Sequence, residues 1–181
     1  MIKKYECVFL DRDGTINVDP GYISSVKDFK FYEYTFEALK LLNKLSNYFI
    51  IITNQSGVSR GIIKEKNLKK INYFIHQKFF ENELRLLKIY YCTDPPENAT
   101  KFRKPGTGMF LQASKEFNLN LKKCIMIGDS YIDIAPATKL GMRSLFILEG
   151  NGKKDLNKFD HLCKPNYIAE NLFLGAKELI K

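Results

Sequence analysis

The sequence predicts an α/β fold with a mainly parallel central sheet, and two observations support this fold class. Short apolar segments rich in Val, Ile, Leu and Phe alternate with longer segments that have helical periodicity. Two of the apolar segments, residues 7–10 and 49–52, are unbroken hydrophobic runs, as in strands buried on both faces of a parallel sheet. Such sheets bind ligands beyond the carboxyl ends of their strands, so we expect the functional residues directly after these segments.

Strands and helices are expected to alternate along the whole chain. The strands are expected at residues 7–10, 48–53, 86–91, 124–129 and 143–148, and the helices at residues 35–45, 64–83, 107–117, 132–140 and from about 171 onward. Thr35 is the predicted N-cap of the first helix, because its hydroxyl can accept a hydrogen bond from a free backbone amide. Leu68, Ile71, Ile75 and Phe79 recur at helical spacing and predict the buried face of the second helix.

The connections between these elements are expected to be irregular. Residues 18–34 lack a helical period and are expected to form a loop over the site, and residues 54–61 form a loop bounded by glycine. Residues 92–105 contain three prolines. Since none of these connections leaves room for a separate lid, the sequence predicts one domain over residues 1–181, with an open site and no large cap domain.

The composition indicates a folded protein, because 45% of the residues are hydrophobic and 13% aromatic. The net charge of +9 comes from scattered lysines with few arginines, which fits a small anionic substrate or a compositional bias and does not favour nucleic acid. The N-terminus lacks the apolar core of a signal peptide, and no stretch approaches the roughly 20 apolar residues of a membrane helix. We therefore expect a cytoplasmic monomer without membrane attachment, whose four cysteines are buried thiols.

Two aspartates, Asp11 and Asp13, end the first apolar run and are followed by Gly14. This arrangement suits phosphoryl transfer, because Asp11 can attack phosphorus while Asp13 protonates the leaving oxygen and later deprotonates water. The simpler interpretation is an Asp-Gly turn that closes a strand, but it leaves the later motifs unexplained.

Polar residues also follow the other expected strands. They are Thr53 and Asn54 after the second strand, Arg103 and Lys104 after the third, and Asp129 and Asp133 after the fourth. Asp11, Asp13 and Asp129 would form an oxygen-rich pocket of the kind that Mg²⁺ prefers. Thr53 and Lys104 can bind the remaining phosphoryl oxygens and stabilise charge in the transition state. Alone, Lys104 would fit an exposed lysine before a proline equally well.

The ordered motifs Asp-x-Asp-Gly-Thr, Thr-Asn-Gln-Ser-Gly, Arg-Lys-Pro and Gly-Asp-x-x-x-Asp resemble the haloacid dehalogenase (HAD) superfamily of phosphohydrolases. From about residue 8 to residue 148, the chain looks like the heptose bisphosphate phosphatase branch of this superfamily. The histidinol-phosphate phosphatases share much of the same pattern. The resemblance implies a three-layer Rossmann-like fold and Mg²⁺-dependent hydrolysis of a small phosphorylated sugar through an aspartyl-phosphate intermediate.

The resemblance also implies a role for each matching residue. Asp11 is the expected nucleophile and Asp13 the general acid and base, while Thr53 and Lys104 steady the phosphoryl group. The expected substrate contacts are Arg12, Asp19, Pro20, Gly21, Tyr22, Thr53, Asn54, Gln55, Ser56, Arg60, Arg103 and Lys104.

Two metal sites follow from the resemblance, and the chain keeps only one of them. Mg²⁺ is expected on the Asp11 carboxylate, the Asp13 backbone carbonyl and Asp129, with Asp133 behind these ligands. The family also carries a zinc loop, Cys-x-His and Cys-x-Cys, before the Arg-Lys-Pro motif. The residues at these four positions here are Cys92, Asp94, Thr100 and Phe102. Since three of the four ligands have changed, we expect no zinc, and a buried Phe102 ring in place of a metal ligand.

Several functions remain open beside the leading one, a sugar bisphosphate phosphatase in the synthesis of nucleotide-heptose precursors of lipopolysaccharide. Histidinol-phosphate hydrolysis uses the same chemistry, and Ser130, where the family often has lysine, leaves the exact substrate open. A nucleic-acid 3′-phosphatase would need a basic aromatic groove, which scattered lysines do not favour. An inactive phosphate-binding module would be favoured by loss of Asp11, Asp13, Lys104 or Asp129, but all four are present.

Overall fold

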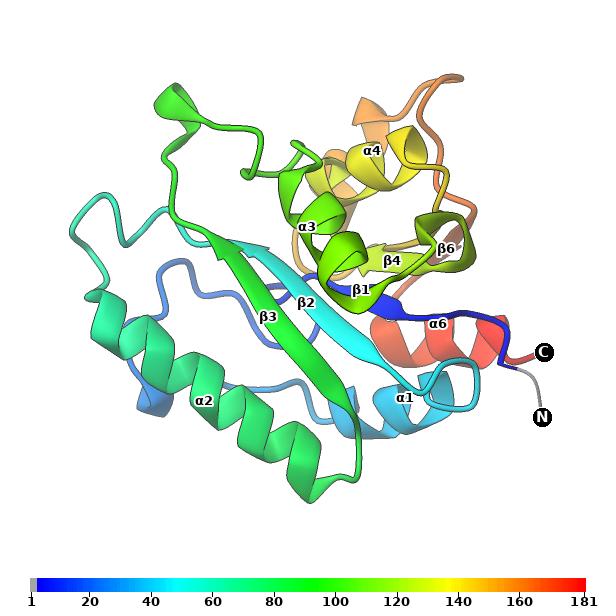
Figure 1. The fold of residues 1–181 in the computed structure, drawn as a ribbon, viewed down its shortest axis with the longest axis horizontal. Coiled ribbons are helices and arrows are strands. Elements are labelled where there is room, and N and C mark those ends of the chain that lie inside the picture. Colours follow the sequence, from blue (N-terminus) through cyan, green and yellow to red (C-terminus); the bar gives the residue numbers. More distant parts are fainter. Residues whose placement is uncertain (1–2) are drawn as a thin grey trace.

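The computed structural model describes residues 3–181, and a six-stranded parallel sheet forms its centre (Figure 1). The strands are β1 (Val8–Leu10), β2 (Phe49–Asn54), β3 (Leu86–Cys92), β4 (Ile125–Gly128), β5 (Arg143–Ile147) and β6 (Tyr167–Ala169). Their order in the sheet is β3-β2-β1-β4-β5-β6. The chain fills one half from β1 to β3 and then crosses back to β4, so the order reverses between β1 and β4. Open α/β sheets bind their ligands at this reversal, outside the carboxyl ends of the strands.

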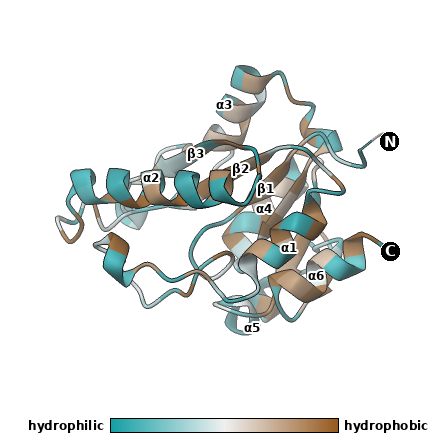
Figure 2. Ribbon diagram, turned by 90° about the horizontal axis from the view of Figure 1, so that it is seen from below, coloured by the Kyte–Doolittle hydropathy of each residue, from teal (hydrophilic) through white to brown (hydrophobic). Residues whose placement is uncertain are grey.

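Helices cover both faces of the sheet. On one face lie α1 (Thr35–Leu42), α2 (Glu65–Glu81) and α6 (Leu172–Leu179), and on the other α3 (Gly108–Phe117) and α4 (Tyr131–Lys139), while α5 (Gly152–Asp155) is a short helix after β5. Val8 and Leu10 pack toward the first group and Phe9 toward the second, as the alternation of a strand requires. Figure 2 shows β1 and β2 as mainly brown and the outer helix α2 as largely teal. These three layers confirm the predicted α/β class.

The predicted elements differ from the observed ones mainly at their ends. Thr35 is the first residue of α1 and not its N-cap, because its hydroxyl donates to the carbonyl of Ile16 (2.7 Å). The helix ends at Leu42, three residues earlier than predicted. The strand β6 and the helix α5 were not predicted. The buried face of α2 was predicted correctly, and all four cysteines are buried free thiols, as predicted.

Within residues 3–181, no helix combines the length and the apolar character needed to cross a membrane.

Candidate active site

Asp11 lies directly after β1, where the strand order reverses. Its backbone amide donates to the carbonyl of Ile127 (2.9 Å), which extends the pairing of β1 with β4 by one residue. The chain then turns through Gly14, whose φ of +82° lies in the left-handed region that glycine tolerates. A side chain at Gly14 would collide with the carboxylate of Asp129. Glycine at this position therefore lets the residues after β1 and β4 approach closely.

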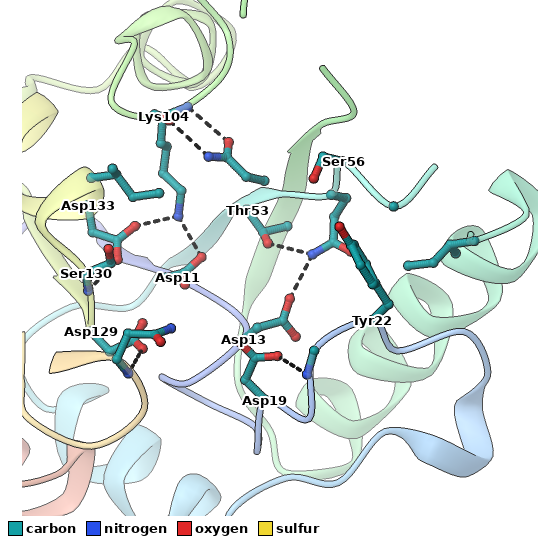
Figure 3. Close-up of a pocket in the computed structure, with 17 residues that line it drawn as sticks. Asp11, Asp13, Asp19, Tyr22, Thr53, Ser56, Lys104, Asp129, Ser130 and Asp133 are labelled. Carbon is teal, nitrogen blue, oxygen red and sulfur yellow. Dashed lines mark hydrogen bonds and ion pairs between the residues drawn. The ribbon is translucent and has the colours of Figure 1, made fainter. Parts of the chain in front are cut away.

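Three carboxyl groups and one ammonium group converge at this point (Figure 3). Asp11, Asp129 and Asp133 each offer one oxygen, and these oxygens lie within 4.8 Å of one another. Lys104 Nζ donates to Asp11 Oδ1 (2.6 Å), to Asp133 Oδ1 (2.5 Å) and to the carbonyl of Ile52 (2.8 Å). Lys104 thus uses all three of its donors, and its single charge faces three carboxyl groups.

The imbalance of charge changes the acidity of these groups. Burial raises the pKa of Asp11 well above its usual range, against the opposing charge of Lys104. Burial and the nearby charge of Asp133 raise the pKa of Asp129 to about 7. Burial alone would lower the pKa of Lys104, but the charges of Asp11 and Asp133 outweigh it and raise that pKa. Lys104 therefore stays charged, while the carboxyl groups lack a full set of counter-charges.

Lys104 is fixed by its backbone as well as by its side chain. Asn54 Oδ1 accepts a hydrogen bond from the Lys104 amide, and Asn54 Nδ2 donates to the Lys104 carbonyl, both at 3.0 Å. This pair of bonds ties the loop after β3 to the end of β2. On the β4 side, Asp129 Oδ2 accepts from the amide of Asn151 (2.7 Å), and Asp133 Oδ2 accepts from the amide of Ser130 (3.1 Å).

The carboxylate of Asp13 lies beside the cluster and is held separately. Arg12 donates to both of its oxygens, from Nε at 3.0 Å and from Nη2 at 2.7 Å. Asn17 Nδ2 adds a bond to Oδ1 (3.0 Å), and Gln55 Nε2 adds one to Oδ2 (2.8 Å). Gln55 Nε2 also donates to Thr53 Oγ1 (2.9 Å), which joins Asp13 to Thr53. Three side chains therefore engage both oxygens of the Asp13 carboxylate through four hydrogen bonds.

A pocket of about 190 Å³ opens over these groups. The predicted site residues that line it are Asp11, Asp13, Asp19, Gly21, Tyr22, Thr53, Asn54, Gln55, Ser56, Lys104, Asp129 and Asp133. Four predicted substrate contacts, Arg12, Pro20, Arg60 and Arg103, are not among its lining residues. Arg12 is only 1% exposed, and its guanidinium donates to the Asp13 carboxylate. Arg103 Nη1 donates to the carbonyl of Asp94 (2.8 Å).

Several residues of the site were not predicted from the sequence. Gly57, Ile63, Ser130, Ile132 and Asn151 also line the pocket. Behind it, Asp155 accepts hydrogen bonds from the Ser130 hydroxyl (2.6 Å) and the Tyr131 amide (2.9 Å), and so fixes the first turn of α4. The capping-box spacing of Ser130 and Asp133 was a usable signal for that turn. Nothing local in the sequence marks Asn151 or Asp155.

Hydrogen bonds hold the loop between β3 and Lys104. Asp94 Oδ2 accepts from the Thr100 amide (2.9 Å) and from its hydroxyl (2.5 Å). Thr100 Oγ1 in turn accepts from the Phe102 amide (3.2 Å). The expected burial of the Phe102 ring is wrong, because the ring is 38% exposed. The polar contacts of Asp94 and Thr100 close the loop, so no aromatic ring has to fill its centre.

The parallel sheet, the acidic cluster and the buried lysine define a phosphohydrolase of the HAD class, and a family model described as HAD-hydrolase-like matches residues 101–173. A D-glycero-beta-D-manno-heptose-1,7-bisphosphate 7-phosphatase of Helicobacter pylori is 36% identical over 150 residues, which are 82% of this chain and 87% of that protein. A D-glycero-alpha-D-manno-heptose-1,7-bisphosphate 7-phosphatase of Campylobacter jejuni is 34% identical over 151 residues, 83% of this chain and 87% of its own length. The chain belongs to this family of heptose bisphosphate phosphatases, which are phosphoric monoester hydrolases.

Solved structures agree with this assignment. The crystal structure of the D,D-heptose 1,7-bisphosphate phosphatase from B. bronchiseptica, complexed with magnesium and phosphate, superimposes with a TM-score of 0.87. The two chains are 25% identical, and the match covers 97% of this chain and 98% of the other.

Proposed function

We propose that this protein removes the 7-phosphate of D-glycero-D-manno-heptose 1,7-bisphosphate in a Mg²⁺-dependent reaction through an aspartyl phosphate. The convergence of Asp11, Lys104, Asp129 and Asp133 on one pocket is the observation that supports this chemistry. The names of the relatives support the substrate. In this role the protein acts as a monomer on a small sugar phosphate, and its product supplies nucleotide-heptose precursors of lipopolysaccharide.

The residues present fit a Mg²⁺ ion. Burial and the neighbouring carboxyl charges raise the pKa of Asp11 and of Asp129, and Lys104 alone does not balance these charges. A divalent cation would supply the missing positive charge. The ligands in this proposal are the carboxylates of Asp11 and Asp129 and the backbone carbonyl of Asp13, with Asp133 behind them. Bound there, Mg²⁺ offsets the repulsion between the nucleophilic carboxylate and the phosphate.

Asp11 is the proposed nucleophile. Lys104 engages Asp11 Oδ1, which leaves Oδ2 to attack phosphorus. The bond from phosphorus to the sugar oxygen breaks, and that oxygen takes a proton from Asp13. Asp13 then removes a proton from a water molecule that attacks the aspartyl phosphate, so that inorganic phosphate leaves and the Asp11 carboxylate is restored.

Thr53 is the proposed hydroxyl donor to the phosphoryl group. Its oxygen already accepts a hydrogen bond from Gln55 (2.9 Å), so the proton of the hydroxyl remains available to donate. Thr53 therefore presents a preformed donor to charge that develops on the phosphoryl oxygens in the transition state, and Lys104 supplies positive charge beside it.

Phosphate release from a panel of substrates tests this proposal. The purified protein is assayed with Mg²⁺ on both anomers of the heptose bisphosphate, on histidinol phosphate and on a DNA 3′-phosphate. We expect kcat/KM for one heptose bisphosphate anomer to exceed the values for the other two classes by at least about tenfold, which equals 1.4 kcal/mol of transition-state binding. Preference for histidinol phosphate or for the DNA end would contradict the proposed substrate but not the class of reaction.

A further inference from the structure

The loop between β5 and α5 packs directly against Asp129, one of the proposed Mg²⁺ ligands. The amide of Asn151 donates to Asp129 Oδ2 (2.7 Å), whereas the Thr15 hydroxyl lies farther away, at 3.4 Å from Asp129 Oδ1. Gly150, with a φ of +66°, permits this approach, because a side chain there would collide with the Asp129 carboxylate and with the backbone of Gly14. The loop after β5 therefore holds one oxygen of this carboxylate at close range.

The same loop leads into α5, whose last residue, Asp155, binds the start of α4. Asp155 Oδ2 accepts hydrogen bonds from the Ser130 hydroxyl (2.6 Å) and the Tyr131 amide (2.9 Å), and Asp155 Oδ1 pairs with Lys158 Nζ (2.7 Å). Burial alone would raise the pKa of Asp155, but the hydrogen bonds from Lys158 and Ser130 outweigh it and lower that pKa. Asp155 therefore stays ionised, and its negative charge stabilises the N-terminal end of α4.

Ser130 connects Asp155 to the acidic cluster. It follows Asp129 directly, and its amide donates to Asp133 Oδ2 (3.1 Å) while its hydroxyl donates to Asp155. A side chain at Gly128 would collide with the Asp133 carboxylate, so this carboxylate packs directly on the end of β4. Figure 3 shows Asp129, Ser130 and Asp133 together on one side of the pocket. Asp155 thus fixes the segment that carries two of the three clustered carboxyl groups.

The backbone around Asp155 is held by bonds that do not involve its side chain. The Asp155 amide donates to the carbonyl of Asn151 (3.1 Å), the residue whose own amide binds the Mg²⁺ ligand. The amide of Glu149 donates to the carbonyl of Glu170 (2.9 Å), and the Tyr34 hydroxyl donates to the Glu149 carboxylate. Truncation of the Asp155 side chain should therefore leave the loop in place and release mainly the start of α4.

We infer that Asp155 is a positioning residue, which acts through Ser130 to hold the carboxyl groups of the proposed Mg²⁺ site together before the metal binds. The inference rests on the proposed function, because that function includes the metal site. Crowded carboxylates repel one another, so a fixed first turn of α4 lowers the cost of gathering them around a cation. Residues that hold metal ligands in this way typically change metal affinity by about 10- to 100-fold when they are lost.

The test measures Mg²⁺ binding to the purified protein by titration calorimetry, without substrate. The variants are Asp155→Ala, Ser130→Ala and the double variant. The matched control is Asp160→Asn, because the exposed Asp160 carboxylate also accepts from two backbone amides, those of Leu162 and Cys163, in the connection from β5 to β6. Phosphate release at increasing Mg²⁺ concentrations and the Tm of the metal-free proteins are measured in parallel.

Asp155→Ala is expected to raise the Kd for Mg²⁺ roughly 10- to 100-fold. The Mg²⁺ concentration for half-maximal phosphate release should rise by the same factor, while kcat at saturating Mg²⁺ changes by less than about threefold. Ser130→Ala should raise the Kd by a smaller factor, roughly three- to tenfold, because the Tyr131 amide still binds Asp155. The double variant should bind Mg²⁺ about as weakly as Asp155→Ala, because both changes break one connection. Asp160→Asn should change none of these values.

The inference would be overturned by an Asp155→Ala protein that has a lower metal-free Tm but a Kd for Mg²⁺ within about twofold of wild type, since Asp155 would then act on stability alone. If Asp155→Ala does not fold, Ser130→Ala decides by the same criterion. Additive effects of the two substitutions would contradict an action through Ser130. A wild-type protein that binds no Mg²⁺ would overturn the inference together with the proposed metal site. One that binds Mg²⁺ but hydrolyses none of the substrates would contradict the proposed function, and the Kd values would still decide the role of Asp155.

Discussion

The floor of the pocket and its rim are built in different ways. The floor, formed by Asp11, Lys104, Asp129 and Asp133, is buried, and its ion pairs measure 2.5 and 2.6 Å. The rim, formed by Tyr22, Arg60 and Glu97, is exposed, and its contacts measure 3.2 and 3.6 Å. In the floor, Asp11 and Asp129 directly follow the paired strands β1 and β4, Lys104 comes from the loop after β3, and Asp133 lies in the first turn of α4. The rim comes from three separate loops.

This difference predicts that substitutions in the floor and in the rim have different effects on activity. Residues of the floor contact one another in a single cluster at the base of the pocket, so the loss of one should disturb the others and affect every substrate. Residues of the rim lie apart from the acidic cluster, so their loss should affect some substrates more than others. Variants of the floor and of the rim can therefore be told apart by their effect on a small aryl phosphate.

The largest effect is expected for Asp11→Asn. The amide keeps the volume of the carboxylate but removes the nucleophile, and the uncatalysed hydrolysis of a phosphate monoester is very slow. We expect turnover of the bisphosphate and of an aryl phosphate to fall together by at least about a thousandfold. Phosphate release is the measurement, and circular dichroism checks the fold. Asp28→Asn, an exposed aspartate on the loop after β1, is the control, and a variant of Asp11 that keeps a tenth of the activity would rule out the assignment.

A smaller and more selective loss is expected for Asp13→Asn. Proton transfer contributes roughly 10²- to 10⁴-fold, so the sugar phosphate should lose activity by a factor in this range. An aryl phosphate has a leaving oxygen that needs little protonation, so its loss should be smaller. Comparison of kcat on the two substrates is the measurement. Equal losses would assign Asp13 a purely structural or metal-binding role.

Most of the floor could be predicted from the sequence because its residues follow apolar runs. Asp11 and Asp129 each end such a run, as does Thr53 outside the floor, and parallel pairing brings these ends to one edge of the sheet. Lys104 was predicted from its motif, but its bonds to Asp11 and Asp133 span 93 and 29 residues and depend on the order of the strands.

The rest of the site depends on contacts that no local pattern encodes. Arg12 was expected to contact the substrate, yet it is buried under Asp13, because Gln55, 43 residues away, completes its environment. Asn151 reaches the site only because β5 lies beside β4. The strand β6 has three residues at the edge of the sheet, too few for a clear alternation of polar and apolar side chains.

Removal of Mg²⁺ is expected to lower the thermal stability of the protein, and more at about pH 8 than at about pH 5.5. The pKa of Asp129 is raised to about 7 in the folded metal-free protein, so folding favours its protonated form. Stability of the metal-free protein should therefore fall as the pH rises from about 4 to about 7, where Mg²⁺ can take the place of the proton. At a concentration about 100-fold above its Kd, Mg²⁺ contributes about 2.7 kcal/mol, or roughly 5–10 °C in Tm.

Calorimetry with Mg²⁺ and with chelator at both pH values measures this effect. Asp129→Asn is the matched control, because it removes the titrating ligand and should abolish the dependence on Mg²⁺. Equal shifts at the two pH values would show that protons and Mg²⁺ do not compete for the cluster.

The smallest effect is expected for zinc, which this chain should neither contain nor need. Structural zinc requires four ligands in tetrahedral geometry, and of the four family positions only Cys92 and Asp94 still carry side chains able to bind it. Asp94 is instead engaged by Thr100, whose hydroxyl and amide lower the pKa of the Asp94 carboxyl. We expect elemental analysis of protein purified without chelator to find well below one zinc per chain, and a zinc-selective chelator to leave Tm and activity unchanged. As a comparison, Thr100→Val should lower Tm slightly, because it removes the hydroxyl that closes the loop. Thr107→Val should leave Tm unchanged, because the Thr107 side chain makes no capping hydrogen bond to α3. Zinc near one equivalent, removable only with loss of stability, would mean that a metal rather than these hydrogen bonds holds the loop before Lys104.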